Sequence, residues 1–263
     1  MNENYGLLIK DIPLTPKSDD RAVFVKIKTF WKTKNIWNDN YIKLFQSQVP
    51  NLAERIRGEK SWDGEGNVNA TRYTCEDFAL RVLVEFSSKY QLPIKIKTGV
   101  RVYENMEFYN PEQHDQYSSN PLGFCDMVMS TFGAPDFQRV GINTVMIDGP
   151  EKLMPGDILA QVHDRRGDVA HHIQLVAASS HSSIQIYQGN SGAGNWLSPM
   201  FKVFGKNPAD PMDHSYTGKP IEIGVYVKSY DEWNYENQTQ GVYKKDYLRL
   251  FSFYRWKFME FNK

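Results

Sequence analysis

The stretch from Leu153 to Asn190 decides the fold, and it reads LMPGDILAQVHDRRGDVAHHIQLVAASSHSSIQIYQGN. Its runs of β-branched residues at 157–162, 169–177 and 184–187 are short and are bounded by Gly, Asp, Ser or Pro. Such runs predict a strand, a hairpin, a second strand, a turn and a third strand. The region therefore predicts an antiparallel sheet.

The first half of the chain predicts helices. The strongest is expected from Cys75 to Tyr90, where apolar residues recur at helical spacing after Thr74, a residue type favoured at helix N-caps. Other expected elements are a strand at 22–28, a helix at 40–56, a polar loop at 58–69, strands at 94–97 and 100–103, a helix at 121–132 with Asn120 as its cap, a strand at 221–227 and another in the aromatic tail at 247–261. Helices followed by strands predict an α+β fold.

Composition limits the function classes. The 263 residues carry 31 Lys+Arg and 31 Asp+Glu, and this balance argues against a nucleic-acid partner. No apolar run is long enough for a membrane span, and the N-terminus does not read as a secretory signal. The chain is expected to be cytoplasmic as synthesised, with a lead-in segment at 1–60 and one core at 61–263.

Cys75 is the candidate nucleophile. Placed at 100° per residue, it begins the buried stripe of its helix, and the helix N-terminus favours a thiolate. The alternative is a small core residue, which is common for cysteine. The other cysteine, Cys125, lies in mid-helix among apolar residues and is interpreted as core.

His172 is the candidate general base, because it starts a predicted strand and would present its ring at the sheet edge. His171 is expected on the opposite face. Gln188 is the first candidate for a residue that orients the imidazole, and Asn190 is the second. The alternative is that both amides simply end a strand before a glycine turn.

These motifs together resemble the papain-like cysteine amidases, including NlpC-type peptidases and CHAP amidohydrolases. The resemblance covers about residues 70–190 and rests on a cysteine opening a helix, the Leu-Met-Pro-Gly-Asp-Ile turn and the His-Ile-x-Leu-Val strand. The CHAP pattern then has Glu-x-Asn, whereas this chain has Gln188-Gly189-Asn190, so an amide replaces the carboxylate. Thr-Cys-Glu-Asp-Phe also lacks the small residues that many members carry after the cysteine.

The resemblance implies a papain-like fold, with the nucleophile at a helix start packed on an antiparallel sheet, and cleavage of a peptidoglycan amide bond through a thioester. No metal or cofactor is implied. The backbone N–H of Cys75 would bind the oxyanion, with a second donor from Asn69 or Tyr73. The chain also looks like type VI secretion amidase effectors, which act in a target periplasm. That likeness implies export without a cleaved signal and an immunity protein as partner.

Two alternatives remain open. A deamidating or acyl-transferring toxin acting on protein would use the same Cys–His pair. A non-enzymatic module that binds glycan or protein is suggested by the aromatic tail, although such aromatics are more often core residues.

Overall fold

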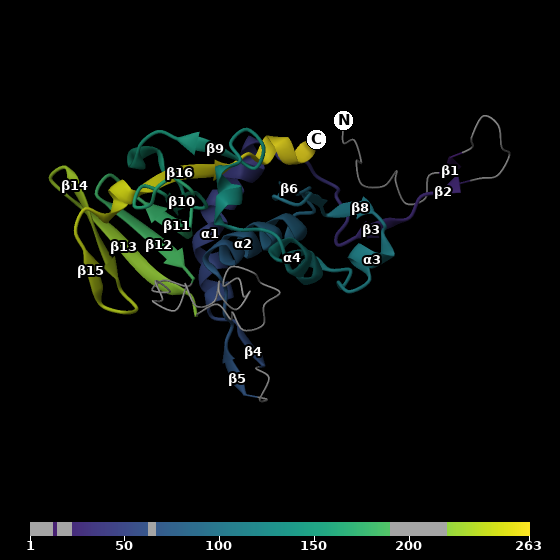
Figure 1. The fold of residues 1–263 in the computed structure, drawn as a ribbon, viewed down its shortest axis with the longest axis horizontal. Coiled ribbons are helices and arrows are strands. Elements are labelled where there is room, and N and C mark those ends of the chain that lie inside the picture. The colour runs from purple at the N-terminus through teal and green to yellow at the C-terminus, as the bar shows by residue number, and fades with distance from the viewer. Residues whose placement is uncertain (1–12, 15–22, 63–66, 190–219) are drawn as a thin grey trace.

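An antiparallel sheet of eight strands is the largest unit of the described chain. The computed structural model describes residues 13–14, 23–62, 67–189 and 220–263. The strands lie in the order β15–β14–β13–β12–β11–β10–β16–β9 (Figure 1). Their bounds are β9 (Thr144–Ile147), β10 (Ile158–Gln161), β11 (His172–Ser179), β12 (Ser183–Gln188), β13 (Glu222–Ser229), β14 (Glu232–Asn237), β15 (Val242–Lys244) and β16 (Phe251–Trp256).

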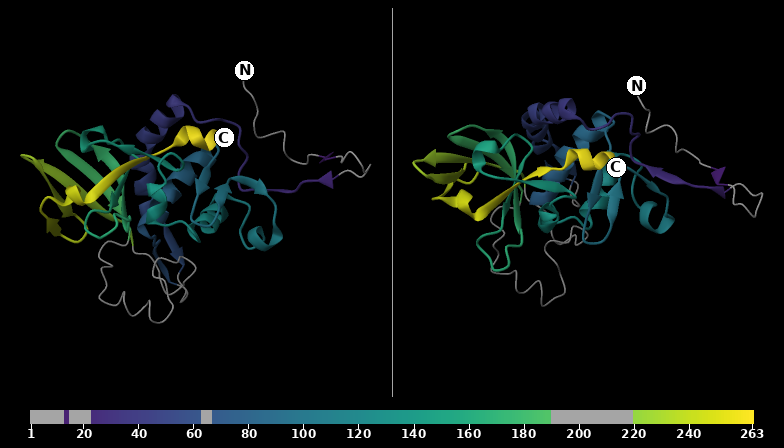
Figure 2. Two further views of the ribbon diagram at one scale, coloured as in Figure 1. Left: turned by 45° about the horizontal axis from the view of Figure 1, so that its top comes forward. Right: turned by 90° about the horizontal axis from the view of Figure 1, so that it is seen from above.

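The helices lie beside this sheet. They are α1 (Asp39–Arg57), α2 (Cys75–Lys89), α3 (Pro111–His114) and α4 (Pro121–Met129), with 3₁₀ helices η1 (Ala134–Gln138), η2 (Pro150–Lys152), η3 (Tyr247–Leu250) and η4 (Phe258–Asn262). Four antiparallel pairs complete the described chain: β1 (Pro13–Leu14) with β2 (Val23–Phe24), β3 (Ile27–Thr29) with β8 (Met106–Phe108), β4 (Lys60–Trp62) with β5 (Val68–Ala70), and β6 (Lys95–Lys97) with β7 (Val102–Glu104). In both views of Figure 2, the large sheet lies on one side of α1 and α2, and the β3–β8 pair lies with α3 on the other side.

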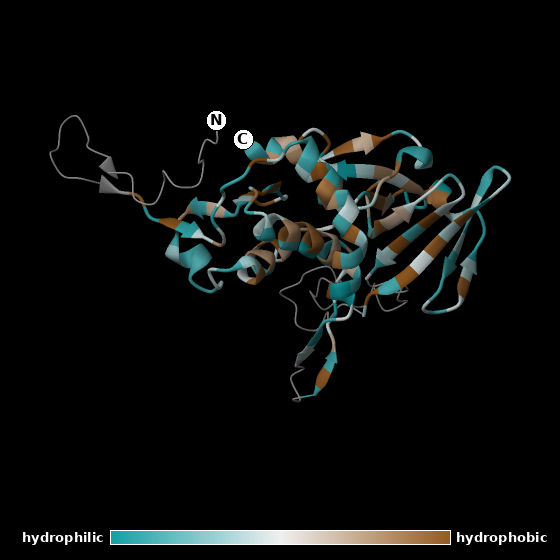
Figure 3. Ribbon diagram, turned by 180° about the vertical axis from the view of Figure 1, so that it is seen from behind, coloured by the Kyte–Doolittle hydropathy of each residue, from teal (hydrophilic) through white to brown (hydrophobic). Residues whose placement is uncertain are grey.

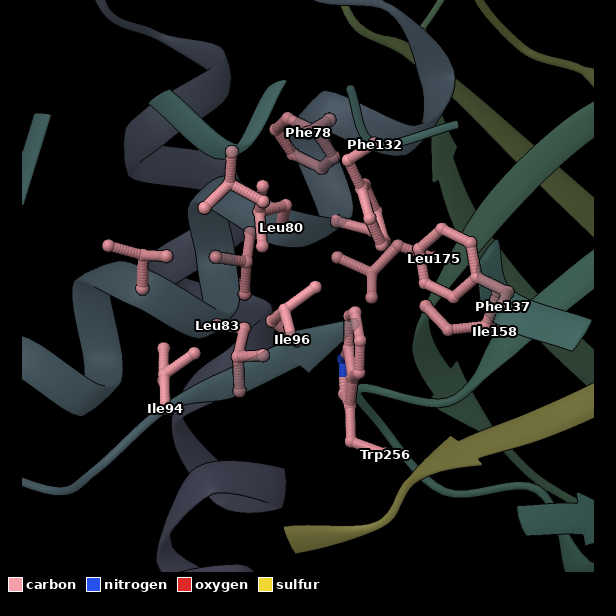
Figure 4. Packing of buried hydrophobic residues seen from close by; sticks show 14 of the residues in the cluster. Phe78, Leu80, Leu83, Ile94, Ile96, Phe132, Phe137, Ile158, Leu175 and Trp256 are labelled. Atoms are coloured by element: carbon pink, nitrogen blue, oxygen red, sulfur yellow. The ribbon is translucent and has the colours of Figure 1, made fainter. Parts of the chain in front are cut away.

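Helix α2 is the centre of the packing. Thr74 caps its start, because Oγ1 of Thr74 accepts a hydrogen bond from the N–H of Asp77 at 3.3 Å. Nearly all side chains of α2 are buried, since the helix packs on β11 as well as on α1 and α4. Figure 4 shows Leu80 and Leu83 of α2 in the same cluster as Leu175 of the sheet.

The large sheet has an apolar cluster on each face. Ile173 and Leu175 of β11 belong to the cluster that includes α2, and we call this side the helix face. Because side chains alternate along a strand, Val176 lies on the opposite side, the distal face, in a second cluster with Ile186 and Tyr226. In Figure 3, hydrophilic (teal) and hydrophobic (brown) residues follow one another along the strands. The sheet therefore separates α2 from the distal face.

The expected α+β class agrees with this mixture of helices and antiparallel sheet. The helices expected at 40–56 and 75–90 are α1 and α2, and Asn120 caps α4 through a 2.9 Å bond from the N–H of Gly123. The strands expected at 157–162, 169–177, 184–187 and 221–227 and in the tail are β10, β11, β12, β13 and β16.

Some boundaries were wrong. The polar loop expected at 58–69 contains the β4–β5 pair, because backbone pairing needs no apolar pattern. The helix expected at 121–132 ends at Met129, and Thr131 beyond it hydrogen-bonds Tyr103 at 2.6 Å through its hydroxyl. Strands β8, β9, β14 and β15 were not expected.

Segments from both sides of position 60 share one core. Trp37 and Phe45 belong to the same apolar cluster as α2, and Trp37 stacks on Phe86. The aromatic tail is also packed inside, with Trp256 and Phe258 in this cluster. In the part of the chain that the structure describes, no helix combines the length and apolarity needed to cross a membrane.

Candidate functional site

Cys75 is the first residue of α2 and is 7% exposed. Its thiol donates a hydrogen bond to Oε2 of Glu76, with Sγ and Oε2 2.9 Å apart. The backbone N–H of Ile173 also points to the sulfur. The thiol therefore lies between an acidic neighbour and the beginning of β11.

The Glu76 carboxylate occupies the start of the helix. It is 6% exposed, and besides the thiol it accepts from its own backbone N–H and from the Thr74 hydroxyl. Burial raises the pKa of Glu76. Burial and the adjacent Glu76 also raise the pKa of the Cys75 thiol well above its ordinary value. This direction is opposite to the one expected from the helix dipole alone, because burial, and then the charge of the adjacent carboxylate, disfavour the thiolate.

His172 is the first residue of β11 and is partly exposed. Its Nε2 lies 3.0 Å from Oε1 of Gln188, the last residue of β12. Burial lowers the pKa of His172 to about 4, so the imidazole is neutral at pH 7. His172 has the same parity as Gln174 and Val176, which places its side chain on the distal face.

The backbones around Cys75 and His172 are close. The sulfur lies at the N–H of Ile173, and a Cβ built on Gly189 would be 2.6 Å from the carbonyl oxygen of Tyr73. The starts of α2 and β11 and the end of β12 thus meet. The side chains do not pair directly: among the described residues, the thiol is hydrogen-bonded to Glu76 and not to His172.

Gln188 lies in a buried polar network on the distal face. Its Oε1 also accepts from Gln174 at 2.8 Å, and its Nε2 donates to Tyr235 at 2.7 Å and to Glu222 at 3.4 Å. Gln188, the first candidate for the third residue, is therefore held in place by hydrogen bonds to several buried side chains.

The other candidates are more dispersed. Asn69 is exposed in β5, and the Tyr73 hydroxyl lies 3.3 Å from Glu59. Asn190 lies outside the described residues. His171 has Nε2 3.5 Å from Asp164, and its buried Nδ1 has no hydrogen-bond partner in the described structure.

Cys125 is a buried residue of α4, 2% exposed, and both cysteines are free thiols. Burial raises the pKa of Cys125. Within the described ranges, no three His, Cys, Asp or Glu side chains are grouped so as to hold a metal ion.

The chain matches no protein-family model, no curated protein and no solved structure. The chemistry must therefore be argued from the arrangement of side chains.

Sequence patterns did not indicate Glu76 or Glu222 as parts of this site. Glu76 follows Cys75 directly, but charged residues are seldom buried. Its position in the sequence therefore did not indicate a bond to the thiol. Glu222 is 34 residues from Gln188 in the chain, and only the pairing of β12 with β13 brings them together.

Proposed function

We propose that the chain is a cysteine amidohydrolase with a papain-like arrangement, in which Cys75 is the nucleophile and His172 the general base. One observation carries the proposal: the thiol that opens α2 lies at the Ile173 N–H, one residue from an imidazole whose Nε2 is paired with Gln188. A thiol, an imidazole and an amide from three neighbouring elements supply the residue types that an activated nucleophile needs.

In the proposed reaction, the Cys75 thiol exchanges its hydrogen bond with Glu76 for one to Nδ1 of His172. The imidazole takes the proton, and the sulfur attacks the carbonyl carbon of an amide. The backbone N–H of Cys75 stabilises the oxyanion, and the second donor, Asn69 or Tyr73, stays a prediction. His172 returns the proton to the leaving amine, and water hydrolyses the thioester.

The proposed substrate is an amide bond in a peptidoglycan stem peptide, a class that comes from the family resemblance. Purified peptidoglycan is incubated with the wild type, Cys75→Ala, His172→Gln and Cys125→Ala, and released fragments are measured by mass spectrometry. We expect fragments from the wild type and from Cys125→Ala only, with unchanged melting curves for the two inactive variants.

Absence of fragments from the wild type would contradict wall hydrolysis. A mass increase of about one dalton at a glutamine of an added protein would then identify a deamidase, because hydrolysis of a side-chain amide replaces NH₂ with OH. Cleavage that survives His172→Gln but not Glu76→Gln would assign the general base to Glu76.

A further inference from the structure

Two buried side chains on the distal face, Glu222 and Gln188, connect β13 to the candidate base. Glu222, the first residue of β13, is 5% exposed. Its Oε2 accepts from Nε2 of Gln188 at 3.4 Å, and Oε1 of Gln188 lies 3.0 Å from Nε2 of His172. The oxygen and the NH₂ group of an amide are nearly the same in shape, so the hydrogen-bond partners must show which end of Gln188 faces Glu222 and which faces His172.

Most partners of Gln188 allow either orientation of its amide. The hydroxyl of Tyr235 can donate or accept, and so can the hydroxyl of Tyr226, which is 2.8 Å from Oε1 of Gln174. Gln174 could therefore turn together with Gln188 and keep its own hydrogen bonds. These neighbours do not decide the orientation.

Glu222 decides it, because an ionised carboxylate only accepts hydrogen bonds. Asn237 holds that carboxylate in place through a 2.8 Å bond from Nδ2 to Oε2. The orientation of Asn237 is fixed in turn, because its Oδ1 accepts from the backbone N–H groups of Thr239 and Gln240 at 3.0 and 2.9 Å. A reversed Gln188 would set its carbonyl oxygen against the Glu222 oxygen, leaving two buried acceptors face to face.

The orientation of Gln188 determines the tautomer of His172. With its NH₂ group on Glu222, Gln188 turns a carbonyl oxygen to Nε2 of His172, and a carbonyl oxygen only accepts. Nε2 must therefore carry the hydrogen, and in a neutral imidazole the other nitrogen, Nδ1, is then the one with a free lone pair.

We propose that Glu222 is a positioning residue that acts through Gln188 to hold His172 in the Nε2–H tautomer, so that Nδ1 is the proton acceptor. The use of Nδ1 by Cys75 rests on the proposed function, whereas the tautomer does not. The proposal also gives a physical role to the amide at position 188: a carboxylate lies one hydrogen bond further from the ring, on β13.

The test is the ¹⁵N spectrum of the His172 ring at pH 7 in the full-length protein, which separates protonated from unprotonated ring nitrogens. We expect a protonated Nε2 and an unprotonated Nδ1 in the wild type. Glu222→Leu removes the carboxylate that orients the Gln188 amide. Both orientations of the amide then become possible, so a mixture of the two His172 tautomers is expected. Glu222→Gln keeps an oxygen for Asn237 and Gln188 and should restore the Nε2–H form. Glu236→Leu, an equivalent change at an exposed position of β14, is the control.

If Glu222→Leu does not fold, Gln188→Leu is the second variant. It is also expected to give a mixture of the two His172 tautomers. With peptidoglycan as substrate, Glu222→Leu should lower kcat with little change in KM, and by less than the roughly 10²–10⁴-fold that a general base contributes, because part of the population keeps the Nε2–H form. An Nδ1–H ring in the wild type, or a pure Nε2–H ring in both Leu variants, would overturn the proposal. The expected tautomer change without cleavage by any variant would overturn the proposed function and leave the role of Glu222 standing.

Discussion

Two candidate acceptors for the proton of Cys75 come from the residues around it. Glu76 holds the thiol by a 2.9 Å hydrogen bond, and His172 begins the strand whose next N–H points to the sulfur. Since the pKa of the thiol is raised by burial and that of His172 is lowered to about 4, the resting pair is thiol and neutral imidazole. In the proposed reaction, the thiol would therefore lose its proton as it attacks, because the two groups do not rest as a thiolate–imidazolium ion pair.

Glu76→Gln should lower the pKa of Cys75. The substitution removes the negative charge that disfavours a neighbouring thiolate, so the pH at which iodoacetamide modification of Cys75 reaches half its maximal rate is expected to move down. Mass spectrometry of the Cys75 peptide measures the rate at each pH. Glu85→Gln, at the other end of the same helix, should leave the curve in place. An upward shift would show that Glu76 assists ionisation.

Asp77→Asn should stabilise the protein at higher pH. Burial and the neighbouring Glu76 raise the pKa of Asp77 from 3.8 to about 8. The folded state therefore keeps a proton that the unfolded state loses, so the native chain loses stability as the pH rises between these values. Asn carries no such proton, and the stability of the variant relative to the wild type should increase with pH in that window.

Urea unfolding at several pH values measures this difference. Asp231→Asn, in an exposed turn, is the control and should show no such trend. A difference between Asp77→Asn and the wild type that is constant over the whole range would mean that Asp77 is ionised in the folded state.

At the scale of elements, the site depends on how closely β12 approaches the start of α2. A Cβ at Gly189 would lie 2.6 Å from the carbonyl oxygen of Tyr73 and 2.8 Å from that of Thr74. Backbone atoms cannot give way as a long side chain can, so only glycine permits this approach. The glycine that follows Gln188 thus allows the strand end to reach the helix that carries Cys75.

Gly189→Ala should destabilise the fold by about 1–3 kcal/mol, the usual cost of overpacking, and should lower activity as β12 moves away from α2. The free energy of unfolding in urea and the rate of substrate cleavage are the measurements. Gly58→Ala is the matched control, because a Cβ there meets only ordinary contacts at 3.5 Å. Equal effects of the two substitutions would contradict a special role for Gly189.

The elements differ in how far sequence could predict them. Thr74 and the apolar spacing after it indicated α2 because both signals are local. The order of the eight strands depends on pairings between distant segments, such as β16 between β10 and β9, and no local pattern encodes them. For the site, the alternation of side chains along the strand predicted opposite faces for His171 and His172. The bond from Cys75 to Glu76 and the link from Gln188 to Glu222 appear only in the folded chain.

At the scale of the molecule, one apolar cluster joins distant parts of the chain. Trp37 is fully buried, donates through its indole N–H to the carbonyl of Pro93, and packs on Phe86 of α2 and Phe258 near the C-terminus. Its backbone N–H is bonded to Asn262. The segment before α1 and the last residues therefore support the helix that carries the candidate nucleophile.

Trp37→Ala should lower the free energy of unfolding by about 3–5 kcal/mol, as expected when a large aromatic side chain is removed from a core. Ile36→Ala is the control at the adjacent position, where the side chain is 43% exposed and little change is expected. Because the cluster is shared, far-ultraviolet circular dichroism and tryptophan fluorescence should give one coincident unfolding transition in urea. Two separated transitions would indicate that the segment before position 60 folds apart from the rest.

The central claim is that Cys75 and His172 work as a nucleophile and its base. The most direct measurement is the rate of iodoacetamide modification at each cysteine, located by mass spectrometry, in the wild type and in His172→Gln. We predict that Cys75 reacts faster than Cys125 in the wild type and that His172→Gln slows Cys75 alone. A rate at Cys75 that equals that of Cys125 and does not respond to the loss of His172 would contradict the pairing.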